Sequence, residues 1–207
     1  MTRLFRDGQQ VEARLRHIHD PHVSPLNDWV RSLQARLGSD AVIPWFDPAD
    51  GGVNAQILWL LEAPGGKATR ERGGSGFISC DNNDGTAENT YRTREEAGVS
   101  RSMVVHWNVI PYYIGTDTKI RAWRHDDVAA VGPLLRELVA LLPKLRCVLL
   151  GGGAAQKVWK QFGPTNPNLR VIDCPHPSAT NVNTRPGTRE AIVATWKQAG
   201  ALTIRAN

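Results

Sequence analysis

The chain has 207 residues, of which 41% are hydrophobic and 22% are charged, as in an ordinary globular protein. No apolar run approaches the roughly 20 residues that span a bilayer, and the N-terminus lacks the apolar core of a secretion signal, so we expect a soluble cytoplasmic protein with no membrane partner. The net charge of +5 favours a polyanionic partner, although charge alone is weak evidence.

The N-terminal segment, residues 1–50, is predicted to be helical and peripheral to a single domain that covers residues 1–207. One short helix is predicted over residues 9–18. Ser24-Pro25 is typical of a helix start and predicts a second helix over residues 26–37.

A short apolar run from Ile57 to Leu61 leads directly into Glu62, a proline and two glycines. The run is too short for a full helix and ends in turn residues, so it predicts a buried strand. Glu62 then lies at the carboxyl end of that strand, where open α/β sheets bind their ligands. The alternative is a charged residue that marks the exit of the strand into solvent, and this stretch alone gives the two interpretations similar weight.

Strands and helices are predicted to alternate along the rest of the chain. This alternation predicts an α/β fold with one central four-stranded parallel sheet and helices on both faces. The three further strands are predicted at 103–109, 147–150 and 169–174, and the helices at 86–96, from Asp126 or Asp127 to 142, after Gly153, and at 188–200.

Polar residues stand at or just beyond the ends of three predicted strands: Glu62, Asn108 and His176. The carboxyl ends of parallel strands meet at one edge of the sheet, so these residues can converge there. Each alone has an ordinary structural explanation, because exposed carboxylates, buried asparagines that satisfy backbone groups, and loop histidines are common. Their joint occurrence favours a functional site.

The glycines at 151–153 follow a predicted strand and suggest dinucleotide binding. The pattern G-x-G-x-x-G fails at its last position, where Gln156 stands. We therefore favour a tight turn that lets strand and helix pack closely. A nucleotide-binding α/β enzyme remains an alternative.

These motifs resemble those of the uracil-DNA glycosylase superfamily over about residues 55–200. Leu-Glu-Ala-Pro-Gly at 61–65 resembles the first active-site motif in its Glu-containing form. Asn108 in Trp-Asn-Val-Ile-Pro resembles the asparagine that reads uracil, and the sequence His-Pro-Ser at 176–178 resembles the second motif. Phe77 falls where such enzymes carry the phenylalanine that stacks on the flipped base.

The resemblance implies a monofunctional, monomeric glycosylase of base-excision repair, which hydrolyses the N-glycosidic bond of uracil in single- or double-stranded DNA without metal or cofactor. Glu62 would act on water, and His176 would stabilise charge on the departing base. Phe77 and Asn108 would bind the flipped base. The other substrate-binding positions that it implies are Ala63, Pro64 and Gly65, and the DNA-binding positions are Gly66, Lys67, Ser178, Thr180, Asn181 and Arg185.

Three features depart from the family pattern. The cysteines Cys80, Cys147 and Cys174 are too few and too scattered for the four ligands of the iron-sulfur branch, and they form no CxxC pair, so we expect no cluster, zinc site or disulfide. Gly65 stands where the major branch has a tyrosine that rejects the methyl group of thymine. Polar residues follow Ser178 where many relatives carry an apolar wedge, which favours single strands over duplexes. A member that binds uracil or abasic DNA with little turnover is a further alternative.

Overall fold

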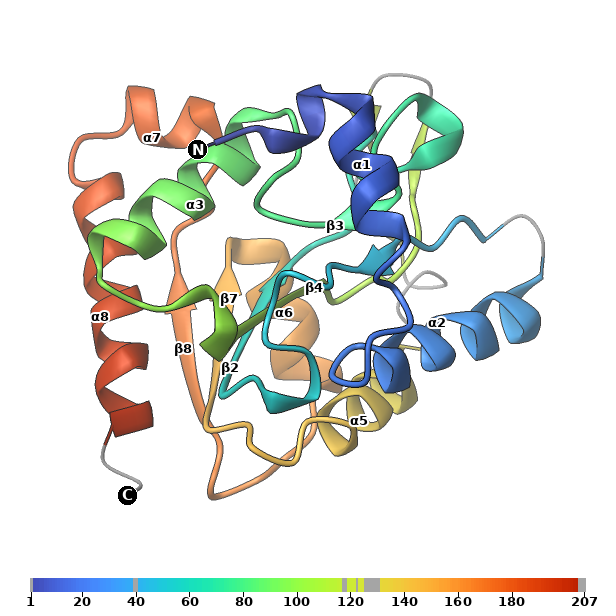
Figure 1. Ribbon diagram of the computed structural model, residues 1–207. Helices are drawn as coiled ribbons and strands as arrows, with labels where there is room; N and C mark the ends of the chain where they lie inside the picture. The colour runs from blue at the N-terminus through green and yellow to red at the C-terminus, as the bar shows by residue number, and fades with distance from the viewer. Residues whose placement is uncertain (1, 39–40, 117–118, 122, 125–130, 205–207) are drawn as a thin grey trace.

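The protein is described by a computed structural model that covers residues 2–38, 41–116, 119–121, 123–124 and 131–204 (Figure 1). A four-stranded, wholly parallel sheet forms its centre, with the strand order β4-β2-β7-β8. The predicted α/β fold is therefore confirmed. The strands of this sheet are β2 (Ile57–Leu61), β4 (Val104–Asn108), β7 (Cys147–Gly151) and β8 (Arg170–Cys174).

Helices cover both faces of the sheet, as the sequence predicts. In Figure 1 α3 and α8 lie on one side of the strands, and α2, α5 and α6 lie on the other. None of the described helices is long and apolar enough to cross a lipid bilayer. The helices are α1 (Gly8–Leu15), α2 (Ser24–Leu37), α3 (Gly85–Glu96), α5 (Val131–Ala140), α6 (Gly153–Phe162), α7 (Ala179–Thr184) and α8 (Thr188–Ile204).

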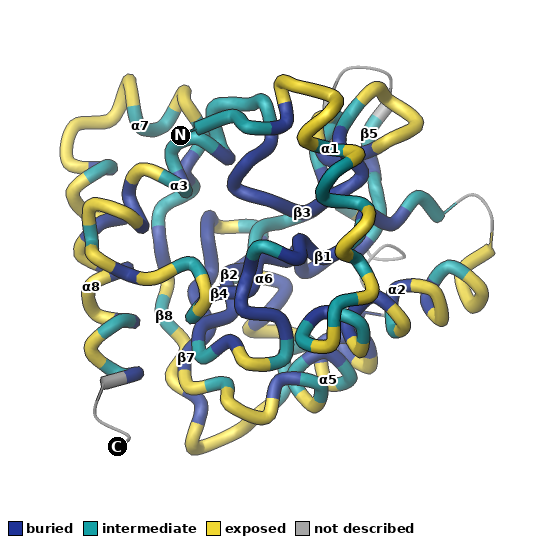
Figure 2. The backbone as a smooth tube through the Cα atoms, in the orientation of Figure 1, coloured by how far each residue is buried: buried dark blue, intermediate teal, exposed yellow. Residues whose placement is uncertain are grey.

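Alternation along the strands divides the apolar side chains into two cores. Leu58 and Leu60 of β2 belong to the core beneath α2, α5 and α6, whereas Ile57 and Trp59 belong to the core beneath α8. Trp59 stacks on Trp196 of α8 with ring centroids 4.8 Å apart. Figure 2 shows the central strands β2 and β7 as buried, while the helices expose their outer faces. A strand buried on both faces explains why the run at 57–61 is continuously apolar.

The N-terminal segment contributes to the core as well as covering it. Helix α2 buries Leu26, Val30 and Leu33 completely. The first helix ends at Leu15, three residues before the predicted end, because the chain turns towards α2.

Two small two-stranded sheets and four short 3-10 turns of the described chain lie outside the main sheet. Strand β1 (Trp45–Phe46) pairs in parallel with β3 (Phe77–Ile78), and β5 (Gly115–Thr116) pairs antiparallel with β6 (Lys119–Ile120). Single 3-10 turns complete the fold: η1 (Leu4–Arg6), η2 (Gly52–Asn54), η3 (Arg70–Arg72) and η4 (Arg101–Met103).

Two further predicted helices differ from the observed ones at their ends. The predicted start of α5, at Asp126 or Asp127, lies outside the described residues, and α8 continues four residues past Gly200. The short helix α7 was not predicted, because its sequence, Ala-Thr-Asn-Val-Asn-Thr, has no apolar period.

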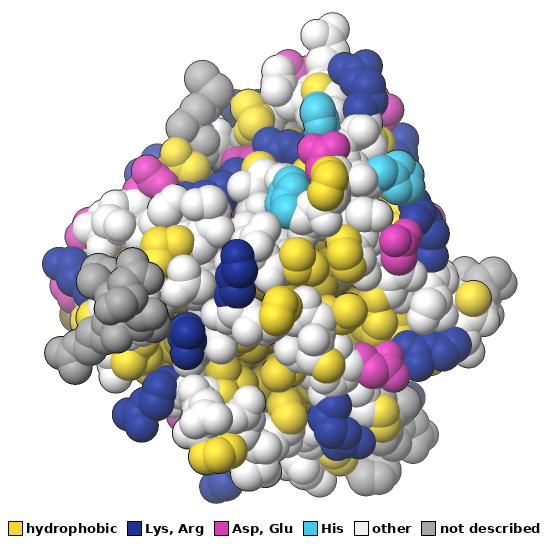
Figure 3. Space-filling view, turned by 60° about the horizontal axis from the view of Figure 1, so that its bottom comes forward, with side chains coloured by type: hydrophobic (Ala, Val, Ile, Leu, Met, Phe, Trp, Pro, Cys, Tyr) yellow, Lys and Arg dark blue, Asp and Glu magenta, His cyan; other side chains and the backbone are white. Residues whose placement is uncertain are grey.

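The basic side chains do not gather on the face turned forward in Figure 3, which is the bottom of the molecule in Figure 1. There the Lys and Arg side chains of the described chain stand among uncharged and apolar ones. The carboxyl ends of the strands lie towards the opposite, upper side of Figure 1.

Candidate active site

A cavity of about 800 Å³ lies at the carboxyl edge of the sheet. The ends of β2 and β4, the loops after β2 and β8, the segment after β3 and the start of α3 all contribute to its wall. Most of the residues that the sequence predicts for the site come together here. Those that line the cavity are Glu62, Ala63, Pro64, Gly65, Gly66, Lys67, Asn108, His176, Ser178 and Thr180.

Glu62 directly follows β2, whose last residue, Leu61, pairs with Asn108 of β4. The peptide carbonyl of Glu62 accepts a hydrogen bond from the backbone N–H of Ile110 at 2.9 Å, which ties the two strand exits together. The side chain is half-buried, and this burial raises the pKa of its carboxyl group. A carboxylate with a raised pKa is a better acceptor for a proton from water than a fully solvated one.

Asn108 is the last residue of β4, and only 2% of its surface is exposed. Its Nδ2 is buried and has no hydrogen-bond partner among the described residues. A buried donor without a partner costs roughly 1–3 kcal/mol. An amide left in this state on a cavity wall is available to a ligand that carries an acceptor.

The backbone fixes the tautomer of His176. The N–H of Ser178 donates to Nδ1 of His176 at 3.1 Å, so the proton of the neutral ring is on Nε2. Burial lowers the pKa of His176, and Asp84, which acts in the opposite direction, does not cancel this effect. His176 is therefore held as a neutral ring with a donor to offer the cavity. The amide of Asn181 donates to the carbonyl of His176 at 3.3 Å and steadies the same loop.

Two of the three glycines at the end of β7 lie in close contact with other parts of the chain, whereas a Cβ on the third, Gly153, would meet no atom of the described residues within 4 Å. A Cβ on Gly151 would lie 2.6 Å from Cδ2 of Leu61. A Cβ on Gly152 would lie 2.9 Å from the Cβ of His176, and Gly152 also has a φ of 94°, which favours glycine. The space beside Gly151 and Gly152 is occupied by side chains of the protein. The two glycines are therefore explained without a bound nucleotide.

The prediction for Phe77 is wrong in this structure. Its side chain is completely buried and stacks on Phe5, with ring centroids 5.6 Å apart. Successive side chains of a strand point in opposite directions, so Ile78 lines the cavity and Phe77 points away from it. Two predicted DNA contacts also lie off the cavity: Asn181 uses its amide on His176, and Arg185 is exposed at the end of α7.

A buried ionic cluster that the sequence did not predict lies next to the cavity and is made of Arg14, Asp47, Asp50, Asp81 and Arg101. Arg101 donates to all three carboxylates, at 2.8 Å to Asp50 and 2.7 Å to each of Asp47 and Asp81. Arg14 pairs with Asp47 and, at 3.2 Å, with Asp81. The cluster joins the N-terminal segment to the loop that follows β3.

His106 was also missed, although a histidine within the apolar run Val-Val-His-Trp-Asn was a signal for it. It lies two residues before Asn108 on β4, is 3% exposed and lines the cavity. Its Nδ1 lies 2.7 Å from the Asp50 carboxylate. His106 thus connects the ionic cluster to the cavity.

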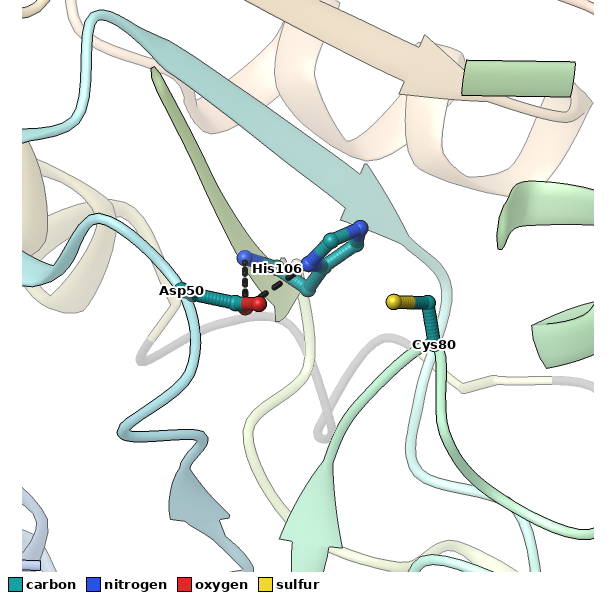
Figure 4. Close-up of side chains that lie close together, drawn as sticks. All are labelled: Asp50, Cys80 and His106. Carbon is teal, nitrogen blue, oxygen red and sulfur yellow. Dashed lines mark hydrogen bonds and ion pairs between the residues drawn. The ribbon is translucent and has the colours of Figure 1, made fainter. Parts of the chain in front are cut away.

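Asp50, Cys80 and His106 lie close enough to suggest a metal site, with one potential ligand atom of each within 4.8 Å of the others (Figure 4). Asp50, however, already accepts hydrogen bonds from Arg101 and from both the backbone and the ring of His106. Burial raises the pKa of the Cys80 thiol to about 12, which opposes the thiolate that a metal requires. The group therefore fits a hydrogen-bonded network better than a cation site.

Comparison with known proteins identifies the family of the chain. Residues 48–200 match the model of the family described as "Uracil DNA glycosylase superfamily". No curated protein is significantly similar in sequence. The chain is similar at 17% identity to a solution structure described as "a putative Uracil DNA glycosylase from Methanosarcina acetivorans"; the match covers 70% of this chain and 91% of that one, with a TM-score of 0.44. Because the family model spans the central sheet and every residue that lines the cavity, the chain belongs to the uracil DNA glycosylase superfamily.

Proposed function

We propose that the protein is a monofunctional DNA glycosylase that releases uracil from DNA in base-excision repair. The observation that carries the proposal is the buried Nδ2 of Asn108, which has no hydrogen-bond partner in the described part of the chain, on a cavity that Glu62 and His176 also line. A hydrogen-bond donor, a basic carboxylate and a neutral histidine at one edge are the groups that such a reaction needs.

Asn108 supplies the recognition of the base. Its amide can donate from Nδ2 to O4 of uracil and accept on Oδ1 from N3–H. Cytosine carries an amino group and a bare N3 at these positions, so a donor would meet Nδ2 and an acceptor would meet Oδ1. A site that hydrogen-bonds its substrate rejects such an analogue much more strongly than apolar contact can.

Hydrolysis breaks the bond between C1′ of the deoxyribose and N1 of uracil, and the electron pair leaves with the base. Negative charge develops on the uracil ring, where the Nε2–H of His176 donates to O2. Positive charge develops on the sugar, and the negative charge of the ionised Glu62 stabilises it. Glu62 takes a proton from water as the water oxygen bonds to C1′, and a proton finally reaches the uracil anion.

Other cavity residues hold the rest of the nucleotide. Ile78 and Pro64 offer the apolar contact that the resemblance assigned to Phe77. Lys67, Ser178 and Thr180 bind the phosphates. Among the described residues other than its chain neighbours, none has an atom within 4 Å of a Cβ built on Gly65, so this residue leaves open space beside the base. Thymine is therefore not excluded by a bulky side chain at that position.

A glycosylase assay tests the proposal. Wild-type protein is incubated with single- and double-stranded oligonucleotides that contain one uracil, and released base and abasic sites are measured in single turnovers. We expect Asn108→Ala and Glu62→Gln each to lower the rate about 100-fold or more, while Lys197→Gln on the exposed face of α8 changes little. Absence of uracil release from both substrates would refute the enzymatic function; tight uracil-dependent binding without product would instead indicate a binding protein.

A further inference from the structure

A second cavity, of about 420 Å³, lies beside the active-site cavity. Its wall is built from two sides, by Arg6, Glu12 and neighbouring N-terminal residues and by the loop that follows β2. We call it the N-terminal cavity, and its volume lies within the roughly 300–1,000 Å³ of ligand sites. Arg6 and Glu12 precede position 48, where the match to the family begins. Part of this candidate ligand site therefore lies outside the family match.

The two cavities share a wall. Lys67 lines both of them. Asn82 lines the active-site cavity, whereas the next residue, Asn83, lines the N-terminal cavity. Ser75 of the N-terminal cavity donates from Oγ to Oδ1 of Asn82 at 2.6 Å. Figure 1 shows α1, which carries Glu12, on the same upper side of the molecule as the carboxyl ends of the strands. A strand that binds in the first cavity can therefore continue into the second.

Hydrogen bonds within the loop hold Lys67 in place between the cavities. The N–H of Ser75 donates to the carbonyl of Lys67 at 3.0 Å, and the N–H of Gly74 donates to the carbonyl of Thr69 at 3.0 Å. A Cβ on Gly74 would lie 2.5 Å from the carbonyl oxygen of Gly66, so the loop folds back closely on itself. This part of the wall is ordered before a ligand arrives, which lowers the entropy cost of binding.

Positive charge predominates around the N-terminal cavity. Its charged residues are Arg6, Lys67, Arg70 and Glu12. Arg70 pairs with Glu12 at 3.0 Å, and both side chains are more than half exposed. The side chains of Arg6 and Lys67 are exposed and have no ion pair or hydrogen bond within the described chain. Three cations and one carboxylate give a net charge of +2, so this cavity favours an anion.

One further polar atom favours a nucleotide over a simple anion. Oδ1 of Asn83 is buried and has no hydrogen-bond partner among the described residues. A phosphate ion would leave this acceptor unsatisfied, whereas every DNA base carries an N–H donor as well as the phosphate of its nucleotide. The ring of Phe5 on the same wall already contacts Phe77 and the guanidinium of Arg14, so it is not free to stack on a base.

We propose that the N-terminal cavity binds the nucleotide next to the flipped uracil, with Arg6 and Lys67 holding the phosphodiester between the two nucleotides. The proposal rests on the proposed function, because the flipped uracil is what places the strand. The binding is polar, so it does not depend on the sequence beside the uracil. Arg6 thereby extends the substrate site into the segment that precedes the family match.

The test is a thermodynamic cycle between Arg6 and single phosphates, with the full chain. The probe is a short single strand with one 2′-fluoro-deoxyuridine, whose fluorine opposes positive charge on the sugar and so prevents cleavage. Each phosphodiester is replaced in turn by an uncharged methylphosphonate, and affinity is measured by fluorescence anisotropy. For the wild type, we expect one replacement beside the uracil to weaken binding by about 3- to 10-fold.

Arg6→Gln should weaken binding of the unmodified strand by a similar factor and should be insensitive to that one replacement, because the two changes remove the same contact. The matched control is Arg16→Gln, at an exposed arginine of the same segment that lines neither cavity. It should keep the full sensitivity to the replacement. The urea midpoints of both variants should equal that of the wild type.

The outcomes separate this inference from the proposed function. If wild type releases uracil but every replacement weakens wild type and Arg6→Gln equally, the N-terminal cavity does not bind the strand while the function stands. If no uracil is released but Arg6 still couples to one phosphate, the function fails and the nucleotide site stands. If inorganic phosphate raises the Tm of wild type but not of Arg6→Gln, and no strand phosphate couples to Arg6, the cavity is a site for a free anion and the inference is overturned.

Discussion

The ionic cluster and the neighbouring cavity differ in whether their buried polar groups have hydrogen-bond partners. In the cluster, Arg101 reaches three carboxylates at 2.7 to 2.8 Å, and each carboxylate has a second donor from Arg14 or His106. In the cavity, Nδ2 of Asn108 has no partner within the described chain. Satisfied buried groups hold segments together, whereas an unsatisfied one on a cavity wall is available to a ligand.

This difference separates stability from activity. Changes in the cluster should unfold the protein more easily, because they leave buried charges unpaired. Changes at the cavity wall should slow the reaction with less effect on unfolding. His106 lines the cavity and contacts Asp50 of the cluster, so it should affect both properties.

The largest effect on stability is expected for Arg101→Met. It removes one guanidinium and leaves three buried carboxylates with too few donors, so the free energy of unfolding should fall by about 3–5 kcal/mol. Urea denaturation measures the change. Arg36→Met, which breaks the more exposed pair with Glu137, should cost less than about 1 kcal/mol. Similar losses in the two variants would show that the cluster is not the stabilising element.

The next largest effect is on activity. His176→Leu removes the neutral Nε2–H donor, and we expect the single-turnover rate of uracil release to fall by about 100- to 1,000-fold, as for the loss of one preorganised donor to a developing oxyanion. The urea midpoint should change little. His17→Leu, at an exposed histidine, serves as the matched control. A rate loss that only follows a loss of folding would contradict the assignment.

Acid should weaken the cluster within a defined window. The pKa of Asp50 is lowered to about 2 in the folded protein, against an ordinary 3.8. Its stabilisation, about 2 kcal/mol, is therefore present above pH 3.8 and is lost as the pH falls towards 2. Wild type should exceed Asp50→Asn in unfolding free energy at neutral pH, and the gap should narrow below pH 4. For the exposed Asp28→Asn, the difference in unfolding free energy from the wild type should not change with pH in this way. A difference for Asp50→Asn that stays constant down to pH 2 would show that the protonation of Asp50 is not linked to folding.

The smallest effect is expected at the mouth of the cavity. Lys67 is exposed there, and Lys67→Gln should weaken binding of a single strand a few-fold while leaving the rate of the bound complex unchanged. The slope of log affinity against log salt should fall by about 0.7, one phosphate contact. Fluorescence anisotropy at several salt concentrations measures both. A slope equal to that of the wild type, as expected for Lys197→Gln, would place Lys67 away from the phosphates.

The sequence could predict those parts of the site that depend on strand ends. Glu62, Asn108 and His176 each follow or end a short apolar run, and the parallel order of the sheet brings such ends to one edge. Their placement on one cavity therefore agrees with the expectation. Their chemical roles depend on pairing that a sequence does not contain, such as the hydrogen bond that fixes the tautomer of His176.

The parts that could not be predicted depend on distant contacts. The direction of Phe77 is set by a two-residue strand, too short to show a period, and by a partner, Phe5, that lies 72 residues earlier. The cluster joins Arg14 to Asp81 and Asp47 to Arg101, and no local pattern links these positions. The one local signal was His106, a histidine within the apolar run of β4.

The contacts of Arg14 and Phe5 have a consequence for how the domain can be divided. Both residues precede position 48, where the match to the family begins. A fragment cut at that boundary would lose Arg14 and Asp47, which pair with Asp81 and Arg101 of the remaining chain, and would uncover the buried ring of Phe77. The region that matches the family model therefore leaves out residues that pack against it, and the N-terminal segment contributes ion pairs and an aromatic contact to the segment that follows β3.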